Sequence, residues 1–167
     1  MDAAEFELRS GVDPGLEEDL VDRLVEYNKE RSEVVRERFE PANLKSEPVH
    51  VFALAPDGSL LGGCAGRVER SWHWLTIDTM WVDANTRGQG IGTALLEAIE
   101  AQGRARGCRW ADVTTFEFQA PDFYRKAGYE QYGVKRDYPP GHTNHFLRKD
   151  LGLGEGDVEV GEGQVGA

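Results

Sequence analysis

The chain has 167 residues, 40 % of them apolar, which predicts one soluble globular domain that folds without disulfides or metals. Its 30 acidic residues outnumber 19 basic ones for a formal net charge of −11, and such a surface repels the phosphates of nucleic acids. The chain shows no apolar run near the roughly 18 residues of a membrane span and no signal-peptide core, so we expect a cytoplasmic protein without nucleic acid or membrane partners.

The first forty residues predict mainly helix. Phe6 and Leu8 indicate a short opening strand, and Asp13-Pro14 follows as an N-cap residue with proline at the first helical position. The helix that starts there has one apolar face, formed by Leu16, Leu20, Leu24 and Tyr27. A second, strongly charged helix is predicted near residues 32–39, and Pro41 ends it.

Six further strands are predicted from runs of apolar, β-branched and aromatic residues between turn signals. They cover residues 49–55, 60–69, 72–82, 108–116, 129–134 and 145–149. Asp57-Gly58 is a hairpin turn between the first two, and Gly62-Gly63 indicates a bulge in the second. Because Cys64 and Cys108 lack CxxC spacing, we interpret them as buried small hydrophobic residues in a reducing cytoplasm.

Two helices are predicted among these strands. One begins in a glycine loop and has an apolar stripe at Ile91, Ala94, Leu95, Ala98 and Ile99. The other runs from Pro121 to Lys126, with Gly128 as its C′ residue. We therefore expect an α+β domain over residues 1–150, with a mixed, mainly antiparallel sheet and helices on both faces. A disordered tail is predicted over residues 151–167, because residues 152–167 hold six glycines, four acids and no Lys or Arg.

The segment Arg87-Gly88-Gln89-Gly90-Ile91-Gly92 lies between a strand and a helix, where anions bind readily. Glycines let the backbone approach a phosphate closely, and the first N–H groups of the helix point at it. A Walker loop ends in Gly-Lys-Ser/Thr, but Gly92 is followed by Thr93, and the GxGxxG spacing of dinucleotide loops is absent. Alone, the segment predicts an anion site or a purely structural turn.

The surrounding residues narrow this choice. The pattern Arg87-x-x-Gly90-x-Gly92, five residues after a strand that ends in Met80-Trp81-Val82, resembles the pyrophosphate motif of the GNAT acetyltransferase superfamily. A second motif of that family lies downstream, Ala120-x-x-Phe123-Tyr124-x-Lys126-x-Gly128-Tyr129. The resemblance covers roughly residues 6–149 in element order, and its specific motifs lie within residues 72–132.

The resemblance implies a GNAT fold, whose sheet splays open at its centre between the strands at 72–82 and 108–116. Pantetheine of acetyl-CoA would lie in that slot. The implied cofactor-binding residues are Met80, Trp81, Val82, Arg87, Gly88, Gln89, Gly90, Ile91, Gly92, Thr93 and Tyr124. One position departs from the family: where relatives often carry Asn, three residues before Ala120, this chain has Glu117, which places a carboxylate near the cleft.

The implied reaction is acetyl transfer from the CoA thioester to a primary amine of a small molecule or peptide. The Val82 N–H is expected to stabilise the oxyanion and Tyr124 to protonate the thiolate, although a tyrosine there is also compatible with a wall or core aromatic. Thr76 occupies the position of a catalytic glutamate in some relatives. The general base is therefore left open between Asp78 and Glu117, and either carboxylate could instead bind a cationic amine.

His142 ends a Pro-Pro-Gly-His loop between the last two strands. We expect it in the acceptor site with Asp78 and Glu117, the alternative being a solvated loop histidine. We interpret Trp72, Trp74 and Trp81 as core side chains, the alternative being that they line an acceptor cavity. Because the His and Cys spacings make no ligand set, we expect no metal.

Other interpretations stay open at this point. A non-catalytic acyl-CoA-binding regulatory module would keep the glycine loop, and an acidic interaction protein would leave it empty. The acidic surface would attract cationic amines. Arg outnumbers Lys fourteen to five, as expected for a protein from a high-salt cytoplasm and also for one from a GC-rich genome. GNAT proteins are often dimers, which leaves a homodimer open.

Overall fold

The computed structural model describes residues 6–152, and the chain divides between Pro41 and Ala42 into two units. Residues 153–167, which make up most of the predicted tail, lie outside the described residues. The first unit holds α1, Pro14–Arg31, and α2, Glu33–Arg38. As predicted, the Asp13 carboxylate caps α1 by accepting the Leu16 N–H at 3.2 Å. Phe6 and Leu8 are not in a strand, so the predicted opening strand is wrong.

The second unit is built on a six-stranded sheet in the order β1-β2-β3-β4-β6-β5. The strands are β1 Glu47–Leu54, β2 Leu60–Glu69, β3 Trp74–Val82, β4 Trp110–Phe116, β5 Glu130–Arg136 and β6 Thr143–Asp150. Two helices, α3 Ile91–Arg104 and α4 Pro121–Lys126, and short 3₁₀ turns at Arg70–Trp72 and Ala84–Thr86 complete it. A further 3₁₀ turn, Pro41–Asn43, spans the division between the two units. None of the described helices is long and apolar enough to cross a membrane.

The turn between β2 and β3 is longer than the sequence predicts, because it takes in residues 70–73. β3 begins at Trp74 instead of residue 72, because Trp72 lies in a 3₁₀ turn and His73 takes a left-handed backbone conformation with φ of 56°. The bulge predicted at Gly62-Gly63 lies one residue earlier, at Leu61, which has no opposite residue in β1.

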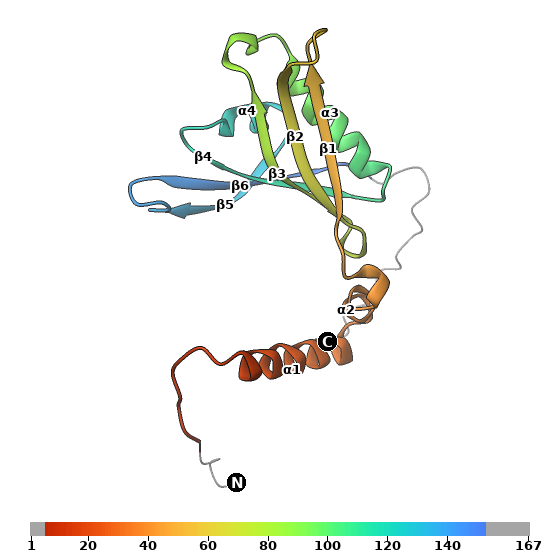
Figure 1. The fold of residues 1–167 in the computed structure, drawn as a ribbon, viewed down its shortest axis with the longest axis vertical. Coiled ribbons are helices and arrows are strands. Elements are labelled where there is room, and N and C mark those ends of the chain that lie inside the picture. Colours follow the sequence, from red (N-terminus) through yellow and green to blue (C-terminus); the bar gives the residue numbers. More distant parts are fainter. Residues whose placement is uncertain (1–5, 153–167) are drawn as a thin grey trace, which may run out of the picture. The chain divides into compact units, whose positions relative to one another are not determined.

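The sheet is antiparallel except at its centre, where β3 and β4 are parallel. These two strands pair only from Trp74 to Ile77 on β3 and from Trp110 to Val113 on β4, and both continue beyond the pairing. Figure 1 shows the result, with β1, β2 and β3 standing steeply in the view while β4, β6 and β5 lie across it. The mixed, mainly antiparallel, centrally splayed sheet is as predicted.

A β-bulge stands where the two halves separate. Ile77 lies opposite Gly66 and Thr79 lies opposite Ala65, so Asp78 has no opposite residue in β2. An extra residue of this kind bends a strand and increases its twist. Gly66 permits the close approach, because a Cβ atom there would lie 2.3 Å from the carbonyl oxygen of Thr76.

The core of this unit lies between the sheet and α3, which packs against β1, β2 and β3. The predicted stripe is confirmed at Leu95 and Ile99, which are buried, whereas Ala94 is exposed. Unexpectedly, the buried face also holds Glu100, whose carboxylate accepts from Lys149 Nζ of β6 at 2.8 Å. Both cysteines are buried as predicted, and burial raises the pKa of Cys64 to about 12 and that of Cys108 to about 11.

Candidate active site

The separation of β3 from β4 opens a cleft of about 990 Å³. Its walls come from β3, the C-terminal half of β4, the segment that leads into α3, and α4. The predicted cofactor residues that line it are Met80, Trp81, Val82, Arg87, Gly88, Gly90, Ile91, Gly92, Thr93 and Tyr124. Gln89 is not among the lining residues, and its amide lies 3.5 Å from the Asn85 carbonyl instead.

One end of the cleft is the N-terminus of α3. Gly88 and Gly90 have φ angles of 78° and 83°, a left-handed conformation that favours glycine. The first bond of the helix runs from the Ala94 N–H to the Gly90 carbonyl. The N–H groups of residues 91–93 therefore have no partner inside the helix, and no acidic residue stands in its first turn. These N–H groups and the helix dipole make an anion-binding site.

The backbone of Val82 faces the opened gap. The next residue, Asp83, donates its N–H to the Leu61 carbonyl on the β2 side. Because peptide groups alternate sides along a strand, the N–H and carbonyl of Val82 point the other way, where β4 has diverged. The Val82 carbonyl accepts from Arg87 Nε at 3.2 Å, which agrees with this direction. The Val82 N–H is thus directed at the cleft.

Tyr124 lies on the opposite wall, on α4. Its hydroxyl is 3.6 Å from the Met80 sulfur, and its ring meets those of Phe123 and Tyr129 edge-on. Burial raises the pKa of Tyr124 to about 12, with a smaller contribution from Cys64. The phenol therefore stays protonated near neutral pH and can donate a proton into the cleft.

Asp78, the bulged residue, lines the cleft but is not free. Its carboxylate is paired with the Arg67 guanidinium, which also lies 3.8 Å from Glu69, and the pKa of Arg67 is raised mainly by the bond to Asp78. On the neighbouring strand, desolvation raises the pKa of the Asp112 carboxyl. Over the described stretch of the chain, residues 6–152, no cluster of His, Cys, Asp and Glu could hold a metal ion.

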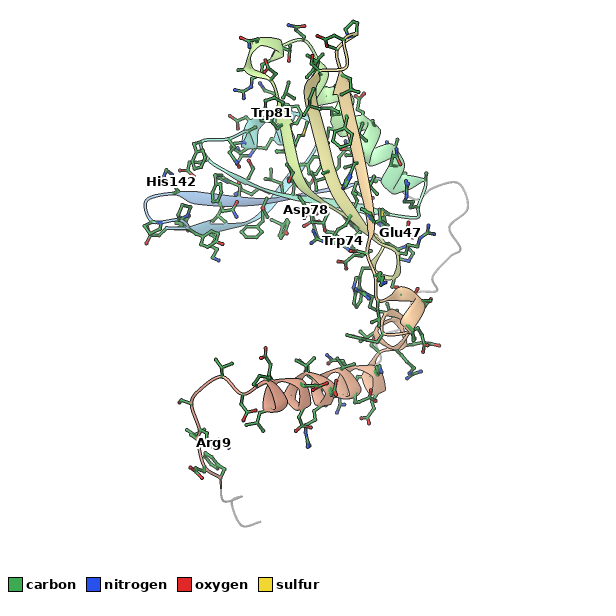
Figure 2. The ribbon with its side chains drawn as sticks, in the orientation of Figure 1. Arg9, Glu47, Trp74, Asp78, Trp81 and His142 are labelled. Carbon is green, nitrogen blue, oxygen red and sulfur yellow. The ribbon has the colours of Figure 1, made fainter. Side chains whose placement is uncertain are left out.

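Glu117 and His142, 25 residues apart in the chain, are in direct contact. His142 Nδ1 lies 2.6 Å from Glu117 Oε1, and the Thr143 N–H donates to Glu117 Oε2 at 2.7 Å. Neither residue lines the cleft itself, but Phe118 does, and its ring packs edge-on against the His142 imidazole at 5.0 Å. Figure 2 shows Asp78 and Trp81 along β3, with His142 beyond them near the start of β6.

Three side chains differ from their predicted roles or were missed, and two of them, Trp81 and Gln119, line the cleft. Trp81 and Trp72 are exposed, at 45 % and 36 %, so the interpretation of both as core is wrong. Gln119 lines the cleft, and its Oε1 accepts from the Phe116 N–H at 2.9 Å and from the Thr115 hydroxyl at 3.2 Å. Its position just before Ala120 was the only signal in the sequence.

Known proteins share this architecture. Residues 15–129 match the model of the acetyltransferase (GNAT) family. The chain is 41 % identical over 133 residues to the blasticidin-S acetyltransferase of Streptomyces morookaense, covering 77 % of this chain and 96 % of that protein. A Bacillus cereus acetyltransferase of known structure superposes with a TM-score of 0.67 at 32 % identity, covering 87 % of this chain and 97 % of that one. A Bacillus anthracis protein crystallised with acetyl coenzyme A shares the fold, with a TM-score of 0.55 at 17 % identity over 64 % of each chain.

Proposed function

The chain belongs to the acetyltransferase (GNAT) family, and we propose that it transfers the acetyl group of acetyl-CoA to a primary amine of a small molecule. One observation carries the proposal. A single cleft joins an anion-binding helix N-terminus, an inward-facing N–H at Val82 and a protonated phenol at Tyr124. Acyl transfer from a thioester needs a place for the donor's phosphates, a donor to the oxyanion and an acid for the leaving thiolate.

The donor would run along the gap between β3 and β4. Its pyrophosphate would rest on the free N–H groups that follow Gly90, with the Arg87 guanidinium beside it. The amides of the pantetheine arm would bond to the backbone of Met80 and Val82, which has no strand partner on this side. The acyl carbonyl would then lie near the Val82 N–H.

The chemical step would be direct attack. The amine nitrogen forms a bond to the thioester carbon, and the Val82 N–H stabilises the resulting oxyanion; losing one such donor costs roughly 3 kcal/mol in other enzymes. The C–S bond then breaks, its electron pair goes to sulfur, and the Tyr124 phenol supplies a proton to the thiolate. The products are the N-acetylated amine and free CoA.

The net negative charge of the chain and its similarity to a known acetyltransferase both support a cationic small-molecule acceptor. The net charge of −11 concentrates cations at the surface, and Asp78 places a carboxylate within the cleft. The Streptomyces relative, 41 % identical, is named for a small antibiotic and not for a protein substrate. These points favour a small amine over a peptide.

Release of free CoA from acetyl-CoA tests the proposal. We would measure it with a panel of amines that includes blasticidin S, polyamines and a basic peptide, for the wild type and Tyr124→Phe. We expect release with at least one small amine and a loss of roughly 100-fold in kcat for the variant. Saturating acetyl-CoA should also stabilise the fold, by about 2.7 kcal/mol at 100 times its Kd. Binding without release on any amine would favour the acyl-CoA-binding module, and no binding at all would overturn both.

A further inference from the structure

We propose that His142 is the group that takes the proton from the acceptor amine, and that Glu117 is the positioning residue that holds its ring. This inference rests on the proposed acetyl transfer and names the proton acceptor for the same cleft. It is carried by the direct contact between the two side chains and by the packing of the His142 ring against Phe118, which lines the cleft.

Both carboxylate oxygens of Glu117 are held by hydrogen bonds, one from His142 and the other from Thr143. Oε1 contacts His142 Nδ1 at 2.6 Å and Oε2 accepts the Thr143 N–H at 2.7 Å. Its own N–H donates to the Thr143 carbonyl at 3.0 Å, which extends the β4–β6 ladder by one bond. The carboxylate therefore has one orientation, set by two strands of the sheet.

The contact with Glu117 determines which nitrogen of the His142 imidazole can accept a proton. The bond to His142, followed by the bond from Thr143, lowers the pKa of Glu117, so the carboxylate stays ionised and can only accept hydrogen bonds. His142 Nδ1 must then carry the hydrogen of the pair. In the neutral ring the lone pair lies on Nε2, the nitrogen turned away from Glu117. A neutral imidazole of that tautomer accepts a proton at Nε2.

The loop that carries His142 is held by its own hydrogen bonds. The Tyr138 N–H donates to the His142 carbonyl and the His142 N–H to the Pro139 carbonyl, each at 2.9 Å. Asp137, the one acid of this loop, accepts the Gly141 N–H at 2.7 Å, and Lys135 of β5 lies over the Tyr138 ring. Glu117 is thus the charged group in contact with the imidazole, whose side chain is 45 % exposed.

The His142 ring also contacts a residue that lines the cleft. Phe118 lines the cleft and packs edge-on against the imidazole, at 5.0 Å between ring centroids. Asp78, the other candidate base, is already paired with the permanent charge of Arg67. This pairing already occupies the Asp78 carboxylate with a fixed cation.

The protons balance over the whole reaction. As the C–N bond forms, one proton of the amine passes to His142 Nε2, which becomes an imidazolium facing Glu117. The departing sulfur takes the Tyr124 proton. The imidazolium then loses its extra proton to solvent, and solvent returns one to the tyrosinate. The sum is an amine and acetyl-CoA giving an amide and CoA.

The experiment measures kcat and KM against pH for His142→Gln, Glu117→Gln and the control His145→Gln. His145 lies on β6, three residues after His142, and its Nδ1 contacts the neutral amide of Gln131 at 2.7 Å. We expect His142→Gln to lower kcat by roughly 100-fold or more and to lose the acidic limb of the rate profile. Glu117→Gln should lower kcat by about tenfold and leave KM for the amine unchanged, since the carboxylate that orients the ring is gone. His145→Gln should behave as wild type.

Chemical rescue separates a proton acceptor from a structural residue. Added imidazole should restore part of the activity of His142→Ala, while the thermal shift of that variant with acetyl-CoA confirms that it is folded. A wild-type kcat and acidic limb in His142→Gln would overturn this inference alone. A change confined to KM for the amine would make the ring a binding wall and overturn it too. If the wild type released no CoA with any amine, the proposed function would fail and this inference with it.

Discussion

Ile77 of β3 and Val113 of β4 are the last residues at which these two parallel strands are paired. One residue later, Asp78 bulges out of the β2–β3 ladder, and from there β3 and β4 separate. Backbone groups that would have been satisfied inside a continuous sheet are left facing a cleft, where a ligand with its own amides can pair with them. The candidate site is therefore made by an interruption of the sheet.

Gly66 should be the least replaceable glycine of the sheet. A Cβ there would lie 2.3 Å from the Thr76 carbonyl oxygen, so we expect Gly66→Ala to lower the free energy of unfolding by about 1–3 kcal/mol. Gly133→Ala is the matched control, because a Cβ at that strand position meets Phe146 at an ordinary 3.8 Å. Urea denaturation compares them, and equal stabilities for the two variants would refute the steric explanation.

Substitutions in the glycine loop should destabilise the protein through backbone strain and not through a steric clash. Gly90 has φ of 83°, and a Cβ added there would meet nothing within 4 Å; Gly58 in the β1–β2 turn has φ of 85° with the same open surroundings. We expect alanine at either position to cost about 1 kcal/mol of stability. Only Gly90→Ala should also weaken acetyl-CoA binding, by roughly tenfold, measured by calorimetry. Equal affinities in the two variants would remove the loop from the binding site.

Stability should fall at alkaline pH because of buried groups that ionise more easily in the unfolded chain. Burial raises the pKa of Tyr124 from 10 to about 12 and that of Cys64 from 9 to about 12. The stabilisation is complete below pH 9 and is lost as the pH rises towards 12, by roughly 3 kcal/mol for each group. Tyr124→Phe removes one of these titrations, so its loss should be shallower, whereas the exposed Tyr138→Phe should follow the wild type. Identical slopes for all three proteins in denaturant titrations would contradict this account.

Removing one partner of the Lys149–Glu100 ion pair should lower the stability more than replacing both partners with apolar residues. Glu100 is 2 % exposed, and Lys149→Met would leave its charge buried, which we expect to cost roughly 2–4 kcal/mol. The double variant Glu100→Leu/Lys149→Met removes both charges and should recover much of that loss. As a surface control, Arg23→Met breaks a pair whose side chains are 77 % and 55 % exposed and should change stability by about 0.5 kcal/mol or less. A double variant less stable than Lys149→Met would disprove the argument.

Local signals in the sequence predicted much of this chain. The bounds of α4, from Pro121 to Lys126, follow from a proline at the first helical position and a glycine at C′, and Gly128 has the expected φ of 90°. The start of α3 at Ile91 follows in the same way from the glycine loop before it. Such features depend on a few neighbouring residues, so no knowledge of pairing is needed to find them.

The tertiary structure alone decided which distant side chains meet. Glu117 and His142 were predicted as separate candidates, and their contact depends on the β4–β6 register, which sets Phe116 opposite Asn144. In the same way, the pairing of Asp78 with Arg67 comes from the bulge in the β2–β3 ladder. A shift of one residue in either register would turn these side chains to the other face of the sheet. The residue types were therefore readable from the sequence, but their chemistry was set by the alignment of the strands.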